Sequence, residues 1–114
     1  MPLDRDQPTL HDIVAAGRLI RQFIAGMDRA VFLADPKTQS AVIHQLLIIG
    51  EATKRLSDAF RSVHPEIPWP KIARTRDMLI HHYEGVDLHE VWKIAHADIP
   101  TLLAALEPLI TEQP

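Results

Sequence analysis

The apolar residues of this chain recur at steps of three and four over two long stretches, and this spacing limits the possible folds most strongly. It places one side of an α-helix against a core, whereas a half-buried β-strand needs alternation at every second residue. No such alternation runs for more than a few residues, and no repeat is visible. The two apolar stripes consist of Leu10, Ile13, Val14, Gly17, Ile20, Ile24 and Met27, and of Val42, Ile43, Leu46, Leu47, Ile49, Gly50, Thr53, Leu56 and Phe60.

Capping signals and prolines set the expected boundaries of the first two helices. Thr9 followed by Asp12 resembles a capping box at the start of the first helix. Asp35 and Pro36 supply a cap and a first-turn proline for a second helix, which is expected to reach about Ser62. The segment HPEIPWP that follows holds three prolines in seven residues, so we expect a rigid connector there.

Similar signals mark the second half of the chain. A third helix is expected to begin near Pro70 and to end by Gly85. Asp87 with Glu90 three residues later forms a capping box for a fourth helix, which Pro100 is expected to kink or split. The expected fold is therefore an all-α up-and-down bundle of four to five helices. We expect a single domain over residues 1–114, with flexible ends at residues 1–8 and 111–114.

Composition and charge exclude several classes of protein. Cysteine is absent, which excludes disulfides, thiolate metal sites and a cysteine nucleophile. The formal net charge of -3 at pH 7 argues against indiscriminate binding of phosphates, so any contact with RNA must use a local basic patch. No apolar run approaches the roughly 18 residues of a membrane span, and the N-terminus lacks the apolar segment of a signal peptide. The expected location is the cytoplasm, with no membrane partner.

Some apolar residues fall outside the two stripes. Leu47, Ile48 and Ile49 follow one another, so they point to different sides of one helix. That helix is expected to be apolar on more than one side, and an interface with a second copy or another partner would explain the surplus.

The nine residues RDMLIHHYE combine an arginine, two adjacent histidines and the only tyrosine of the chain. On an ideal helix Tyr83 lies within about 20° of Arg76, while His81 lies about 140° from it. Either the helix is distorted near its end, or Arg76 of one chain meets His81 of another. Asp77 and His81 are four residues apart and are candidates for an ion pair. Spacing alone leaves open whether these residues form a site or a solvated helix end.

The order of these residues resembles the R-x4-6-H motif of the HEPN superfamily, and the following Y-E-G-V-D-L-H-E-V-W resembles its HepT-like ribonuclease branch. Further matches are F-I-A-G-M at 23–27, A-V-I at 41–43, I-I-G-E-A-T-K at 48–54 and I-P-W at 67–69. A bare R-x4-H pattern recurs by chance, but the whole set in this order is specific and spans about residues 10–100.

The resemblance implies a small all-α ribonuclease toxin that acts as a homodimer and is encoded beside a minimal nucleotidyltransferase antitoxin. It implies that Arg76 and His81 are the catalytic pair, placed in a cleft between the two chains, and no metal or other cofactor is expected there. It further implies that the antitoxin, using ATP and Mg²⁺, attaches AMP to Tyr83 and so silences cleavage of tRNA or mRNA. Asp77 stands where the family often has asparagine.

Other side chains are candidates for supporting roles. Glu51 and Lys54, in the G-E-A-T-K element, are expected to orient Arg76 through a salt bridge. His82, between the histidine and the tyrosine of the motif, is expected to be exposed or to lie at an interface. The candidates for contact with RNA are Lys71, Arg74 and Lys54.

Two other classes of function remain open. In the first, the protein is a non-catalytic docking or substrate subunit of a nucleotidyltransferase, so that Tyr83 is modified but RNA is not cleaved. In the second, it is a helical scaffold without chemistry. A neighbouring reading frame with the nucleotidyltransferase pattern G-S-x10-D-x-D would argue against the scaffold.

Overall fold

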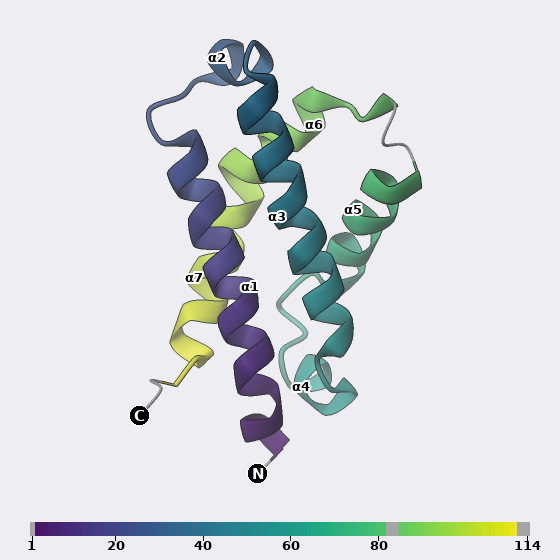
Figure 1. The fold of residues 1–114 in the computed structure, drawn as a ribbon. Helices are drawn as coiled ribbons and strands as arrows, with labels where there is room; N and C mark the ends of the chain where they lie inside the picture. Colours follow the sequence, from purple (N-terminus) through teal and green to yellow (C-terminus); the bar gives the residue numbers. More distant parts are fainter. Residues whose placement is uncertain (1, 82–84, 112–114) are drawn as a thin grey trace.

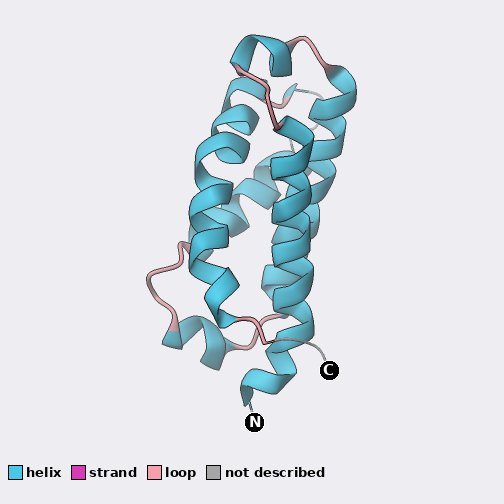
Figure 2. Cartoon of the chain, turned by 90° about the vertical axis from the view of Figure 1, so that its left-hand side faces the viewer, coloured by secondary structure: helices cyan, strands magenta, loops and turns pink. Residues whose placement is uncertain are grey.

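The chain forms an up-and-down bundle in which four long helical segments alternate in direction (Figure 1). The computed structural model describes residues 2–81 and 85–111. Within these residues every regular element is helical and no strand occurs (Figure 2), which confirms the all-α fold class expected from the sequence. The elements are α1 (Pro2–Ile24), α2 (Arg29–Leu33), α3 (Pro36–Arg55), α4 (Asp58–Val63), α5 (Trp69–His81), α6 (Leu88–Lys93), η2 (Ile94–Asp98), α7 (Ile99–Leu106) and η3 (Glu107–Leu109).

Helix α1 begins earlier than the sequence indicated. We expected a start at Thr9 and a flexible end before it, but residues 5–8 belong to the helix. Asp6 is buried and accepts hydrogen bonds from the backbone N–H and the hydroxyl of Ser57, at 2.9 and 2.8 Å. Gln7 donates to the carbonyl of Leu109 at 3.0 Å and accepts from the N–H of Thr111 at 2.9 Å. These partners lie far away in sequence, so local signals at Thr9 could not indicate them.

Helix α3 starts as predicted and ends early. Asp35 caps it by accepting from the N–H of Thr38 at 3.1 Å, and the Thr38 hydroxyl bond lowers the pKa of the Asp35 carboxyl. The expected continuation to Ser62 is wrong, because the backbone turns extended at Leu56 and a new helix, α4, follows. Ser57 caps α4, accepting from the N–H of Phe60 at 3.0 Å.

The last helical segment also follows the predicted signals. Asp87 caps α6 by accepting from the N–H of His89 at 3.0 Å. Before Pro100 the helix widens into a π-turn, η2, in which the N–H of Ile99 donates to the carbonyl of Ile94. Proline has no N–H to offer the preceding turn, so a local change in helical pitch is expected there. α6, η2 and α7 thus form one continuous helical rod, in which the helix changes type just before Pro100.

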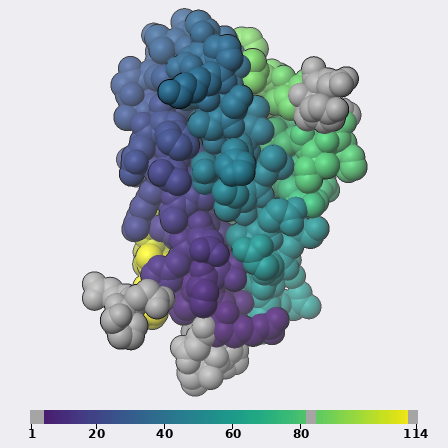
Figure 3. All heavy atoms as spheres, viewed as in Figure 1, coloured from purple at the N-terminus to yellow at the C-terminus, as the bar shows by residue number. Residues whose placement is uncertain are grey.

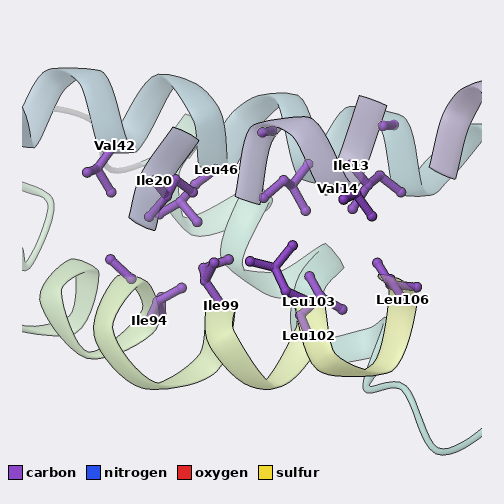
Figure 4. Close-up of a cluster of buried hydrophobic side chains, with 14 of the residues drawn as sticks. Ile13, Val14, Ile20, Val42, Leu46, Ile94, Ile99, Leu102, Leu103 and Leu106 are labelled. Atoms are coloured by element: carbon purple, nitrogen blue, oxygen red, sulfur yellow. The ribbon is translucent and has the colours of Figure 1, made fainter. Parts of the chain in front are cut away.

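The core lies between α1 and α3 on one side and the η2–α7 rod on the other (Figure 4). Trp92 is buried and packs against Phe32 with ring centroids 5.4 Å apart. Helix α5 packs on α3, and the two run side by side on one face of the molecule (Figure 3). No helix within residues 2–81 and 85–111 is both long and apolar enough to cross a membrane. Core side chains labelled in Figure 4 are Ile13, Val14, Ile20, Val42, Leu46, Ile94, Ile99, Leu102, Leu103 and Leu106.

Candidate functional site

Arg76 lies at a close contact between α5 and α3. A Cβ atom built on Gly50 of α3 would lie 2.5 Å from the Cβ and 2.8 Å from the Cγ of Arg76, closer than side chains pack. Only a glycine therefore lets the two helices meet at this point. The sequence indicated Gly50 as part of an apolar stripe but not this contact. A glycine inside a long helix was the available signal for close backbone approach.

The guanidinium of Arg76 is held by two carboxylates. Its Nε and Nη2 face one oxygen of Glu51, and its Nη1 donates to Asp77 Oδ1 at 3.1 Å. The hydrogen bond with Glu51 is the main cause that raises the pKa of Arg76 above its usual value. The charge of Glu51 and the contact with Asp77 raise this pKa further, while partial burial opposes them. The predicted salt bridge between Glu51 and Arg76 is therefore present.

These two contacts leave part of the Arg76 guanidinium able to donate to another group. A guanidinium has five N–H groups, and roughly two of them, on Nη1 and Nη2, are not directed at the carboxylates. The Arg76 side chain is 21% exposed, whereas Glu51 and Asp77 are 49% and 58% exposed. One positive and two negative charges make this cluster acidic as a unit, so further cations are needed to attract a phosphate.

His81 is the last residue of α5 and is exposed. α5 is a regular α-helix from Trp69 to His81, so His81 lies about 140° around the axis from Arg76. Among the described residues no ion pair joins Asp77 to His81, because Asp77 contacts Arg76 instead. The described part of α5 therefore shows no distortion that would bring Arg76 and His81 of one chain together.

The remaining basic candidates lie on two helices: Lys54 on α3, and Lys71 and Arg74 on α5. Lys54 is exposed and follows Gly50 by four residues, so it lies on the Arg76 side of α3. Lys71 instead forms an ion pair with Asp98, 3.0 Å away. Arg74 lies on the same side of α5 as Lys71, about 160° around the axis from Arg76. The structure thus does not bring Lys71 and Arg74 together with Arg76. The predictions for His82 and Tyr83 fall outside the described residues.

Within the described ranges, no three or more His, Asp or Glu side chains lie close enough together to hold an ion. The prediction that catalysis needs no metal stays a prediction, because it concerns activity.

Gly50→Ala is expected to lower the free energy of unfolding by about 1–3 kcal/mol through overpacking. The added methyl would meet Arg76 Cβ, which moves only with the backbone of α5. This loss should exceed the gain of about 1 kcal/mol that alanine ordinarily brings to a helix interior. Urea unfolding measures the change, with Gly85→Ala as the control, since a Cβ there meets no described atom within 4 Å. A more stable Gly50→Ala protein would contradict the close contact.

Comparison with known proteins gives a consistent match over most of the chain. The family model described as Ribonuclease HepT-like matches residues 13–109. A protein of Thermococcus cleftensis named probable ribonuclease HepT is 49% identical over 100 residues, which is 88% of this chain and 91% of the relative. A Methanocaldococcus jannaschii protein whose name marks it as a candidate RNase is 38% identical over 112 residues, covering 98% of this chain and 93% of the relative. No solved structure matches.

Proposed function

The chain belongs to the HepT-like ribonuclease family, and on this basis we propose that it is an endoribonuclease, the toxin of a type II toxin–antitoxin pair. In this proposal Arg76 and His81 cleave RNA, either tRNA or mRNA. A cognate minimal nucleotidyltransferase antitoxin silences the protein by attaching AMP to Tyr83. The observation that carries the proposal is Arg76 itself, which is held by Glu51 and Asp77, keeps roughly two further N–H groups, and lies on the helix that ends at the exposed His81.

The proposed chemistry uses no metal. A base removes the proton of the ribose 2'-hydroxyl, its oxygen attacks the adjacent phosphorus, and the 5'-oxygen leaves with a proton from an acid. Histidine suits both proton transfers because its ordinary pKa lies near neutrality. Arginine stays charged and can donate two hydrogen bonds to the phosphorane-like transition state. The expected products carry a 2',3'-cyclic phosphate and a 5'-hydroxyl.

The separation of Arg76 from His81 around α5 supports a site shared by two copies of the chain. In a homodimer, the two His81 side chains would divide the roles of acid and base, and both Arg76 side chains would hold the phosphate. Ile43 and Leu47 of α3 are partly buried, and Ile80 of α5 is 41% exposed. Ile80 follows Arg76 by four residues on α5, Leu47 precedes its neighbour Gly50 by three on α3, and Ile43 lies about one turn further along α3. We infer that this α3–α5 face is the dimer interface, since burial of exposed apolar residues favours association.

Ile80→Asp is expected to shift the protein toward the monomer and to abolish RNA cleavage, because it places a charge in the proposed interface. Light scattering coupled to size exclusion measures the molar mass. Val31→Asp is a matched control, since Val31 is also an exposed apolar residue, at 50%, but belongs to α2 rather than to α3 or α5. A monomeric Ile80→Asp protein with full activity would argue for a site within one chain.

Attachment of AMP to Tyr83 would inhibit RNA cleavage directly. AMP would add a negative phosphodiester close to Arg76 and fill the space where RNA binds. Arg76 lies seven residues earlier in the chain, and its guanidinium could pair with the attached phosphate. Inhibition then needs no change in the fold of the chain.

Tyr83→Phe is expected to keep RNA cleavage and to escape silencing, because phenylalanine has no hydroxyl to accept AMP. The wild-type and mutant proteins would be incubated with the neighbouring nucleotidyltransferase, ATP and Mg²⁺, then analysed by mass spectrometry and RNA cleavage assay. Wild type should gain mass in AMP units while the mutant should not. Continued silencing of unmodified Tyr83→Phe would mean that the partner acts by binding alone.

The proposal is tested by incubating the purified chain with tRNA and with mRNA, in the presence of EDTA. Cleavage is expected in EDTA, because no step uses a metal. If no RNA is cut but Tyr83 still accepts AMP, the alternative of a non-catalytic substrate subunit is supported instead. If neither reaction occurs, the chain is better described as a scaffold.

A further inference from the structure

A hollow in the molecule lies between α5 and the η2–α7 rod. It encloses about 290 Å³, close to the lower limit of small-molecule pockets. Its floor is formed by Leu46 and Ile49 of α3, and its walls by Ile72 of α5 and by Ile94, Leu102 and Ala105 of the rod. We call this hollow the α5–α7 groove.

The α5–α7 groove is separate from the Arg76 cluster. Ile72 and Thr75 line the groove; around α5, Thr75 lies about 100° from Arg76 and Ile72 about 40° from it. Glu51, which holds Arg76, does not line the groove. The residues that line the groove are thus different from those of the Arg76 cluster, and the two regions adjoin each other along α5.

The polar groups of the groove favour a cation. Its charged lining residues are Glu66, Lys71 and Asp98, which sum to one negative charge. Asp98 Oδ2 is shielded from solvent and pairs with Lys71 Nζ, 3.0 Å away, while the Asp98 side chain as a whole is 31% exposed. Lys71 itself is 42% exposed, so its ammonium can turn to water at little cost.

The groove hydroxyls do not compete for this oxygen. Thr75 donates to the carbonyl of Lys71 at 3.0 Å, and Thr101 donates to the carbonyl of Ala97 at 3.2 Å. Asp98 also closes the π-turn η2, a helix irregularity that often accompanies functional sites. The buried Asp98 oxygen is therefore the acceptor best placed for a ligand that enters the groove.

We propose that the α5–α7 groove binds a small amphipathic organic cation. Its apolar body lies on Ile49, Ile72 and Leu102, and its ammonium or guanidinium group donates to Asp98 in place of Lys71. Apolar contact supplies most of the affinity, and the charged hydrogen bond selects a cation over a neutral or anionic molecule of the same length.

The test compares three six-carbon probes: n-hexylammonium, 1-hexanol and hexanoate. Each is titrated into the full chain with ¹³C-labelled Ile and Leu methyl groups, and the methyl spectrum is recorded. We expect shifts centred on the methyls of Ile72, Ile94 and Leu102. Hexylammonium should saturate at about tenfold lower concentration than hexanol, and hexanoate should bind more weakly than either. Equal binding of all three probes, or shifts outside the groove, would overturn the proposal.

Two pairs of variants separate ligand binding from changes in folding. Ala105→Leu fills the groove and should prevent binding, whereas Ala104→Leu, on the exposed neighbouring position, should not. Asp98→Asn should bring hexylammonium and hexanol to similar affinities, while Lys71→Met should strengthen hexylammonium binding by removing the competing ammonium. Weaker hexylammonium binding to a folded Lys71→Met protein would show that Asp98 is not the acceptor. None of these readouts depends on RNA cleavage.

Discussion

Replacing His81 with alanine is expected to lower the rate constant of RNA cleavage by about 10²–10⁴-fold, the usual contribution of a general acid or base. The histidine is exposed at the end of α5, so its removal should change stability by no more than about 0.5 kcal/mol. A loss of activity without a loss of stability would thus assign His81 to the chemistry rather than to the fold.

The rate constant should be measured in single-turnover reactions with excess protein and one labelled RNA, alongside the melting temperature. His89→Ala is the matched control, because His89 is another exposed histidine near a helix end. It should cleave at the wild-type rate. Undiminished cleavage by pure His81→Ala protein would remove His81 from the mechanism.

Arg76→Ala is expected to slow cleavage by about 10²–10³-fold, as when one donor to the transition state is removed. Arg76→Lys should recover little of this loss. Lysine carries a point charge, whereas the planar guanidinium contacts Glu51 and Asp77 and still has N–H groups for a phosphate. The effect should fall mainly on the rate of the chemical step rather than on RNA affinity, since the two carboxylates already offset the charge of Arg76.

Arg18→Ala is the matched control for this experiment. Arg18 on α1 donates through its Nε and Nη2 to a single oxygen of Glu107, at 2.9 and 2.7 Å, as Arg76 does to Glu51. Its side chain is 53% exposed, so its removal should cost little stability and leave cleavage intact. If Arg18→Ala and Arg76→Ala slow cleavage equally, the effect of Arg76 is structural.

Most of the bundle could be predicted because its helices carry local signals. Asp35, Asp87 and Pro100 each mark a boundary through a side chain or ring that acts within one turn. The two errors at helix ends share one cause. Asp6 binds Ser57 across 51 positions, a contact that no local pattern reports, and Ser57 both receives this contact and caps α4 where α3 was expected to continue.

Within the site, the sequence motifs indicated which residues would meet, but not how the two helices that carry them approach each other. The Glu51 salt bridge to Arg76 was expected, but the contact of Arg76 with Gly50 required the relative placement of α3 and α5. Lys71 was expected near RNA because it precedes Arg76 in sequence. The helical twist instead turns Lys71 toward Asp98 on the η2–α7 rod, a partner that sequence proximity could not indicate.

The central claim is that Arg76 and His81 cleave RNA through the neighbouring 2'-hydroxyl. Its most direct test is to give the purified wild-type chain, in EDTA, an RNA with a single 2'-deoxynucleotide immediately 5' of the bond that is cut. We expect the all-ribose RNA to yield a 2',3'-cyclic phosphate and a 5'-hydroxyl, and the substituted RNA to stay intact at that bond. Cleavage at the deoxy position, or fragments that end in a 3'-hydroxyl, would contradict the claim.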